Sequence, residues 1–135
     1  MTMFDDVVDL HKFFEIPLPQ RPTPLDAELS SYRMTFLREE LAEVEEALND
    51  ENLVALADGL ADLICVALGT AALAGIPFNK VFEVVHKANL TKRRAPAELT
   101  KRGHEYDLIK PHDFVRPEDG ILNIIAEASA RGSSL

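Results

Sequence analysis

The sequence predicts an all-α fold, a bundle of four to five helices whose core is completed by oligomerisation. Apolar residues recur at three- and four-residue spacing, the helical period, in five separate segments. Prolines, glycines and short polar runs separate these segments. No stretch alternates apolar and polar residues as a strand would, and no internal repeat is present. The length of 135 residues, 47% of them hydrophobic, suits one globular domain over residues 1–135.

The first two expected helices flank a proline-rich connector. Residues 4–14 carry an approximate helical stripe of apolar side chains. Four prolines in the connector 17–24 exclude a helix there and predict an extended chain. The second helix begins near Asp26 or Ser30 and runs to about Asn49. Its 3-4-3-4 apolar seam predicts the packing face of a bundle helix: Met34, Leu37, Leu41, Val44 and Leu48.

The third helix covers about residues 53–74 and is closed by Gly75 and Pro77. It is apolar on nearly every side, so we expect it to be buried in the bundle. One chain with four or five short helices can hardly cover such a helix completely. The uncovered apolar face therefore predicts a homo-oligomer, with a dimer as the minimal unit.

The last part of the chain contains two more expected helices. The fourth begins at about Pro77 or Asn79 and ends at Asn89. Beyond it the helical period fades in the segment 91–117, which is rich in basic residues and interrupted by prolines. A final helix covers about residues 118–130.

The distribution of charge excludes some functions and indicates others. A net charge of −9 argues against general nucleic-acid binding, which needs clustered cations. Residues 1–86 hold five Lys/Arg and sixteen Asp/Glu, whereas residues 87–110 hold seven Lys/Arg and three Asp/Glu. An acidic body followed by a basic segment can hold a cation on one side and a phosphate on the other. A solvated surface with uneven charge is the simpler alternative.

Composition also predicts the compartment. The one cysteine, Cys65, allows no disulfide within the chain and suits a reducing environment. The N-terminus carries acids where a signal peptide needs a basic region. No eighteen consecutive residues are both apolar and uncharged, so we expect no membrane segment. These features predict a cytoplasmic protein.

Two carboxylates interrupt the apolar third helix. Asp58 and Asp62 are the only charged residues in the stretch 53–76, and a spacing of four places them about 40° apart, on one face. A buried carboxylate without a partner is costly, so each needs one. Helix capping or pairing with Arg and Lys would satisfy them. A shared cation is the alternative.

The preceding helix supplies further acids at the edge of its seam: Glu39, Glu40 and Glu43. The polar turn at residues 49–52 makes the two helices an antiparallel hairpin, which brings Glu43 roughly level with Asp58. Several ionised carboxylates cannot share a site without a cation. Oxygen donors of this kind favour Mg²⁺, Mn²⁺ or Ca²⁺. Glutamates on exposed helices are common, however, and Glu45 and Glu46 are expected to be of that kind.

The runs REELAEVEEAL, ADGLADLICVALGTAALAGI and VFEVVHKANLTK resemble the MazG-like, all-α nucleoside triphosphate pyrophosphohydrolases, in particular the phosphoribosyl-ATP pyrophosphohydrolase-like branch. That family holds Mg²⁺ with EExxE on one helix and ExxD on the next. Three glutamates match the first half: Glu39, Glu40 and Glu43. Asp62 matches the second half, but Gly59 stands where the family has Glu, and Asp58 is the nearest acid. The resemblance continues through Asn89-Leu-Thr-Lys92 and Lys110-Pro111, like the family's NxxK and C-terminal K…P segments.

The resemblance implies Mg²⁺-dependent hydrolysis between the α and β phosphates of a nucleotide, with Mn²⁺ as a possible substitute for Mg²⁺. The implied metal ligands are Glu40, Glu43, Asp58 and Asp62, and Glu39 would orient or deprotonate the attacking water. The implied phosphate-binding residues are Asn89, Lys92, Arg93 and Lys110. A helix C-terminus with a favourable cation explains Asn89 and Lys92 equally simply. Members of the family form homodimers or dimers of dimers, so the expected partners are a nucleotide substrate and further copies of this chain.

Three functions remain open at this point. The chain could hydrolyse ordinary or deoxynucleoside triphosphates such as dUTP or dCTP. It could hydrolyse phosphoribosyl-ATP in histidine synthesis. The missing glutamate at Gly59 also fits a weakened member that binds nucleotide and metal without efficient turnover.

Overall fold

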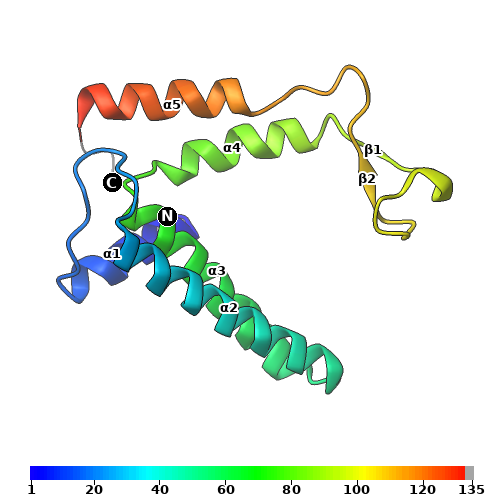
Figure 1. The fold of residues 1–135 in the computed structure, drawn as a ribbon, viewed down its shortest axis with the longest axis horizontal. Helices are drawn as coiled ribbons and strands as arrows, with labels where there is room; N and C mark the ends of the chain where they lie inside the picture. The colour runs from blue at the N-terminus through cyan, green and yellow to red at the C-terminus, as the bar shows by residue number, and fades with distance from the viewer. Residues whose placement is uncertain (133–135) are drawn as a thin grey trace.

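The computed structural model describes residues 1–132, and over these residues the chain forms five α-helices and one very short β-ribbon (Figure 1). The helices are α1 (Met3–Phe13), α2 (Ala27–Asn49), α3 (Leu53–Leu73), α4 (Phe78–Asn89) and α5 (Glu118–Arg131). The ribbon pairs β1 (Arg93–Arg94) with β2 (Leu108–Ile109), and a 3-10 turn, η1 (Ala97–Leu99), lies between them. The predicted all-α class is confirmed, and each helix lies within a few residues of its predicted position.

Side-chain caps fix where the first three helices begin. The Thr2 hydroxyl accepts a hydrogen bond from the Asp5 N–H, and the Asp5 carboxylate accepts one from the Thr2 N–H, which makes a capping box. The Asp26 side chain accepts from the Leu29 N–H at 2.7 Å, so α2 begins at the first of the two predicted positions. Asn52 caps α3 in the same way through the Ala55 N–H.

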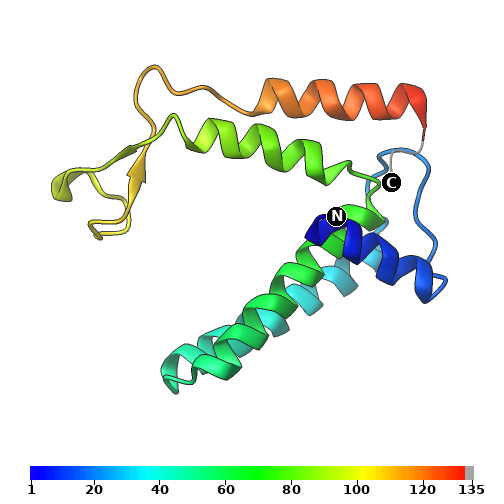
Figure 2. The same ribbon diagram turned by 180° about the vertical axis from the view of Figure 1, so that it is seen from behind.

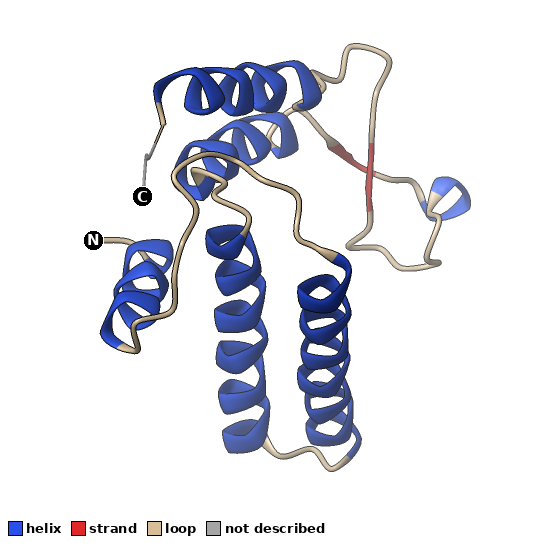
Figure 3. Cartoon of the chain, turned by 60° about the vertical axis from the view of Figure 1, so that its left-hand side comes forward, coloured by secondary structure: helices blue, strands red, loops and turns tan. Residues whose placement is uncertain are grey.

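The main core lies between α1 and α3 (Figure 3). Each helix contributes three buried side chains: Phe4, Val7 and Val8 from α1, and Leu68, Ala71 and Ala72 from α3. Leu18 of the proline-rich connector and Phe78 at the start of α4 pack against this cluster. The core thus holds α1, the far end of the α2–α3 hairpin and the start of α4 together.

The chain turns sharply between α3 and α4, and two pairs of helices diverge from this corner. The α2–α3 hairpin runs one way and the α4–α5 pair another, as the opposite views of Figures 1 and 2 show. Gly75 forms the corner with a positive φ of 68°. A Cβ there would lie 2.6 Å from the carbonyl oxygen of Arg21, so only glycine fits. The Thr23 N–H also donates to the Ala74 carbonyl at 2.8 Å, which fixes the connector against the corner.

Helix α3 is not buried on all sides in the single chain, as expected of an apolar helix that one chain of this size can hardly cover. Leu53 and Val54 are 79% and 82% exposed, and Leu60 and Ile64 are partly exposed. Only α1 and α2 lie extensively against α3, because α4 leaves it at the corner. The predicted seam of α2 is also only partly used: Val44 is buried, but Met34, Leu41 and Leu48 are about half exposed.

Helix α3 is also the one helix in residues 1–132 that is long and apolar enough to cross a membrane by length and composition. The sequence criterion of eighteen uncharged apolar residues excludes it because Asp58 and Asp62 interrupt the run. The core helix of a soluble protein can have the same length and composition, so these properties alone do not show whether α3 lies in a membrane or in a protein core.

The ribbon between α4 and α5 was not predicted, since two-residue strands are too short to show an alternating pattern. Arg93 pairs with Ile109 and Arg94 with Leu108 in antiparallel register. We call residues 91–117 the arm. In Figure 1 it extends beyond the right-hand ends of α4 and α5 and lies clear of the α2–α3 hairpin.

Candidate metal centre on the α2–α3 hairpin

The α2–α3 hairpin brings three carboxylates together. Glu40, Glu43 and Asp62 each offer one oxygen atom, and these oxygens all lie within 4.8 Å of one another. The two helices approach closely at this level because Gly59 is buried against Val44. A Cβ on Gly59 would lie 3.2 Å from Cγ2 of Val44. The residue that departs from the family motif is therefore part of the helix contact beside the carboxylates.

The environment of Glu40 is unfavourable for a free carboxylate. Its Oε2 atom is buried and has no hydrogen-bond partner. Desolvation raises the pKa of Glu40, and the negative charges of Glu43 and Asp62 raise it further. A cation would supply both the missing partner and the missing charge. The donors are all carboxylate oxygens, which suits Mg²⁺ or Mn²⁺.

Two other predicted site residues on the hairpin lie at its surface. Asp58 is exposed and outside the group of three, so the expectation that Asp58 and Asp62 are buried is wrong in the single chain. At about 100° per residue, Asp58 is turned away from Gly59, which faces α2. Glu39 is exposed beside Glu40, and its charge contributes to the raised pKa of Glu40.

A buried arginine on the same hairpin was missed by the sequence analysis. The guanidinium of Arg33 donates to the Val66 carbonyl at 2.8 Å and to the Thr70 hydroxyl at 3.1 Å, which ties α2 to α3. Gly69 makes room for it, since a Cβ there would lie 2.8 Å from Nη2 of Arg33. Arg33 precedes Glu40 by seven residues and so lies on the same face, two turns away. Arg33 therefore joins α2 to α3 two turns away from the carboxylates.

The predicted phosphate-binding residues gather elsewhere. Asn89 ends α4, and its carbonyl accepts the Lys92 N–H at 3.1 Å in a tight turn. Arg93 lies in β1, 3.9 Å from Asp113, and Nζ of Lys110 lies over the Phe114 ring. All four predicted residues thus lie at or near the base of the arm: Asn89, Lys92, Arg93 and Lys110. Within one chain they are not brought to the carboxylates, because the α2–α3 hairpin and α4 diverge (Figure 1).

A pocket on the described part of the chain lies apart from these residues. It has a volume of about 360 Å³ between α1 and the start of α4, with Phe4, Asp5, Lys12 and Lys80 among its lining residues. None of the three carboxylates lines it. Because Glu43 and Asp62 are exposed, the carboxylate centre is an open site on the hairpin surface.

The protein is all-α, and its α2–α3 hairpin brings three carboxylates together. One of them has a buried oxygen without a hydrogen-bond partner, so the site is suited to a divalent cation. A comparison with protein-family models identifies the family. Residues 7–89, more than half of the chain, match the model described as phosphoribosyl-ATP pyrophosphohydrolase, and the chain belongs to this MazG-like, all-α family. The resemblance inferred from the sequence is thereby confirmed, and membership implies a nucleotide pyrophosphohydrolase.

The matched range includes the whole α2–α3 hairpin and ends at Asn89, before the arm. No curated protein matches the chain at a significant level.

Proposed function

We propose that the protein hydrolyses a nucleoside triphosphate between its α and β phosphates in a Mg²⁺-dependent reaction, with Mn²⁺ as a possible substitute. The products would be a nucleoside monophosphate and pyrophosphate. Water adds its oxygen to one of the two phosphorus atoms, and the other leaves with the bridging oxygen. The observation that carries the proposal is the convergence of Glu40, Glu43 and Asp62 in a chain of this family.

Each residue has a distinct role in this proposal. Glu40, Glu43 and Asp62 would hold the ion. When bound, Mg²⁺ offsets the charge of the phosphate oxygens and favours ionisation of water. Glu39 lies one residue from Glu40 and is exposed, so it can accept a proton from the attacking water. Four residues would hold phosphate oxygens: Asn89, Lys92, Arg93 and Lys110.

We further propose that the working protein is a homodimer or a dimer of dimers. The support is the row of exposed large apolar side chains along α2 and α3: Met34, Leu41, Leu48, Leu53, Val54, Leu60 and Ile64. Large apolar side chains that gather on the surface of a protein in water usually mark an association face. A dimer also gives the base of the arm a route to a carboxylate site that its own chain does not provide.

We assign the protein to the cytoplasm, without nucleic-acid or membrane partners. The exposed thiol of Cys65 suits a reducing compartment. The net charge of −9 disfavours both nucleic acid and anionic membrane surfaces.

Phosphoribosyl-ATP is a second candidate substrate, favoured by the description of the matching family model. A pyrophosphate-release assay with phosphoribosyl-ATP and with ribo- and deoxynucleoside triphosphates, each with Mg²⁺ and with EDTA, decides between the candidates. We expect Mg²⁺-dependent pyrophosphate and a nucleoside monophosphate from at least one substrate. Release of single phosphate would contradict cleavage between the α and β phosphates. Nucleotide binding without pyrophosphate would identify a weakened member of the family.

A further inference from the structure

We propose that the pocket between α1 and the start of α4 is a second ligand site, which binds a phosphate monoester of an apolar ring compound, specifically a nucleoside monophosphate. Its volume is about 360 Å³, and small-molecule sites commonly measure about 300–1,000 Å³. None of the three converging carboxylates lines this pocket. The choice of a nucleoside monophosphate rests on the proposed function, of which it is a product, whereas the phosphate site itself does not.

Hydrogen bonds hold the two walls of the pocket together at the start of both helices. The Asn79 side-chain N–H of α4 donates to the Asp5 carboxylate of α1 at 3.0 Å, and the Thr2 hydroxyl donates to the Asn79 side-chain oxygen at 2.8 Å. The Thr2 N–H donates to the same carboxylate, and this bond above all keeps the pKa of Asp5 below its usual value. The Phe4 and Phe78 rings also lie 5.9 Å apart, centre to centre. The spacing of α1 and α4 is therefore fixed, and so is the width of the pocket.

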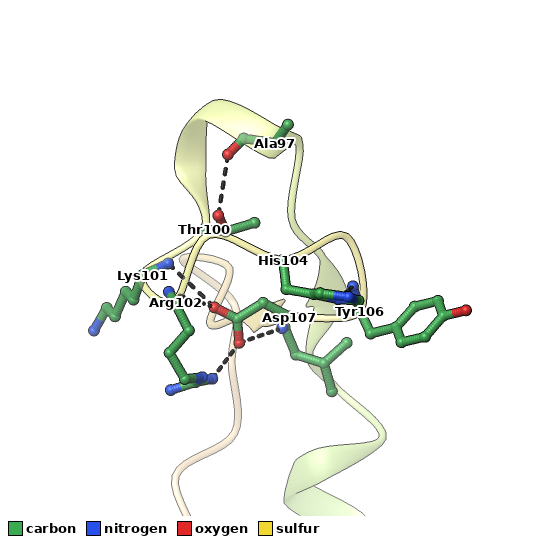
Figure 4. A network of polar contacts seen from close by, with 8 residues as sticks. Ala97, Thr100, Lys101, Arg102, His104, Tyr106 and Asp107 are labelled. Atoms are coloured by element: carbon green, nitrogen blue, oxygen red, sulfur yellow. Dashed lines mark hydrogen bonds and ion pairs between the residues drawn. The ribbon is translucent and has the colours of Figure 1, made fainter. Parts of the chain in front are cut away.

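Each wall supplies one lysine whose charge is not engaged. Lys12 lies in the last turn of α1 and Lys80 in the first turn of α4, and both line the pocket. Within residues 1–132 neither lysine lies at ion-pair distance from a carboxylate. Arg102 of the arm, by contrast, pairs with the buried carboxylate of Asp107 (Figure 4). Lys12 and Lys80 are therefore free to bind an anion between the two helices.

The charges around the pocket match one phosphate group. A phosphate monoester carries about −1.5 to −2 charges at neutral pH, which the two lysines balance. Asp5 and Asp9 also line the pocket, so every further negative charge on a ligand would be repelled by two carboxylates. A triphosphate carries more negative charge than two lysines can balance. The pocket therefore selects a monophosphate over a triphosphate.

The remaining lining groups select what the phosphate is attached to. Phe4 and Val8 belong to the main core and present an apolar surface to the pocket together with Pro77, so a flat ring can pack there. Asp9 is exposed and forms no ion pair in the described part of the chain. Its carboxylate can accept a hydrogen bond from a ribose hydroxyl or from an amino group of a base. Inorganic phosphate has neither the ring nor these groups, so it should bind more weakly.

Calorimetric titration of the full chain in EDTA measures this site without turnover. The probes are AMP, ATP and inorganic phosphate, and we expect AMP to bind at least about tenfold more tightly than either of the others. Lys12→Ala combined with Lys80→Ala should weaken AMP binding at least about tenfold, since the phosphate loses both charged partners. Lys87→Ala is the matched control, because Lys87 is an exposed lysine of α4 outside the pocket. No AMP binding at millimolar concentration, or an equal loss in Lys87→Ala, would overturn the site.

A substitution at Asp9 tests how the body of the ligand is recognised, and it leaves both lysines in place. Asp9→Ala removes a charge that repels phosphate, whereas AMP also loses a hydrogen-bond acceptor. The ratio of the AMP affinity to that of inorganic phosphate should therefore fall at least about threefold. Glucose 6-phosphate, a monoester with a polar body, should bind more weakly than AMP because it gains little from the apolar surface. An unchanged ratio in Asp9→Ala, or equal binding of glucose 6-phosphate, would overturn the assignment to a nucleoside monophosphate.

Binding of AMP at the carboxylate centre is the outcome to separate from binding in the pocket. Glu43→Gln should leave the AMP affinity within about twofold of the parent, since Glu43 does not line the pocket. A loss as large as that of the lysine double variant would place AMP at the carboxylates and overturn the second site. AMP binding that depends on Lys12 and Lys80, in a protein that releases no pyrophosphate, would keep the pocket as a phosphate site and reject the proposed function. Pyrophosphate release without such AMP binding would keep the proposed function and reject the pocket.

Discussion

Replacement of Glu43 by glutamine tests the carboxylate centre with the smallest change of shape. The three converging oxygens carry three negative charges within 4.8 Å of one another, and Glu43→Gln removes one of them. A divalent ion held there would face two negative charges instead of three. Loss of a metal ligand commonly costs several kcal/mol of transition-state stabilisation, and each 1.4 kcal/mol is about tenfold in rate. We therefore expect turnover to fall by at least about a hundredfold.

The assay is pyrophosphate release across a Mg²⁺ titration, with Mn²⁺ binding measured separately by its paramagnetic effect on water relaxation. Glu45→Gln is the matched control, because Glu45 is an exposed glutamate on the same helix outside the group of three. The control should keep parental turnover and Mn²⁺ affinity. If Glu43→Gln hydrolyses nucleotide as fast as Glu45→Gln and binds Mn²⁺ equally well, the assignment of a metal centre to this hairpin is refuted.

The remaining predictions concern single residues of the hairpin and the corner. Asp62→Asn should lose turnover as Glu43→Gln does, whereas Asp58→Asn should lose less than about threefold because Asp58 lies outside the group; equal losses in the same assay would restore Asp58 as a ligand. In EDTA, the raised pKa of Glu40 means that the folded chain binds a proton on this carboxyl group more tightly than the unfolded chain does. The protonated carboxyl group therefore stabilises the fold at low pH, and this stabilisation is lost as the pH rises through the raised pKa. The thermal unfolding midpoint in EDTA should therefore fall as the pH rises through the pKa of Glu40. If Glu40→Gln shows the same dependence of its midpoint on pH as the parent, Glu40 is not the cause. Gly75→Ala should lower the free energy of unfolding by at least about 2 kcal/mol, since it adds a backbone clash to left-handed strain. Gly103 also has a positive φ, but a Cβ added there would have no atom within 4 Å. Gly103→Ala should therefore lower the free energy of unfolding by only about 1 kcal/mol in denaturant titrations. Equal losses in the two variants would contradict the close packing at the corner.

The positions of the helices were predictable because local chemistry sets them. The caps at Asp26 and Asn52, the glycine after α3 and the prolines of the connector act within a few residues of the chain. The convergence of acids from α2 and α3 also followed from the sequence, because a short turn makes the two helices antiparallel neighbours.

Burial and divergence were not predictable, because they depend on what each helix meets. The sequence predicted that a single chain leaves part of apolar α3 uncovered, but it did not show that α4 leaves α3 at Gly75 and so determines which side is exposed. Asp58 shares a face with Asp62 by spacing alone, but the contact of Gly59 with Val44 decides which side of α3 faces α2. The two strands of the arm are too short to show a period, and buried Asp107 holds them through contacts that no local pattern reveals.

Gly59 leaves the hairpin with three carboxylates in the converging group, and this number has a consequence for the order in which ligands bind. If each of the three carboxylates supplied one oxygen, half of the octahedral shell that Mg²⁺ prefers would be left for water or phosphate oxygens. We expect the chain to bind the free ion weakly and to take it up together with its nucleotide. The rate should then follow the concentration of the magnesium–nucleotide complex rather than that of either component. Nucleotide in excess over Mg²⁺ should act as a competitive inhibitor, because it would occupy the phosphate-binding side without bringing an ion.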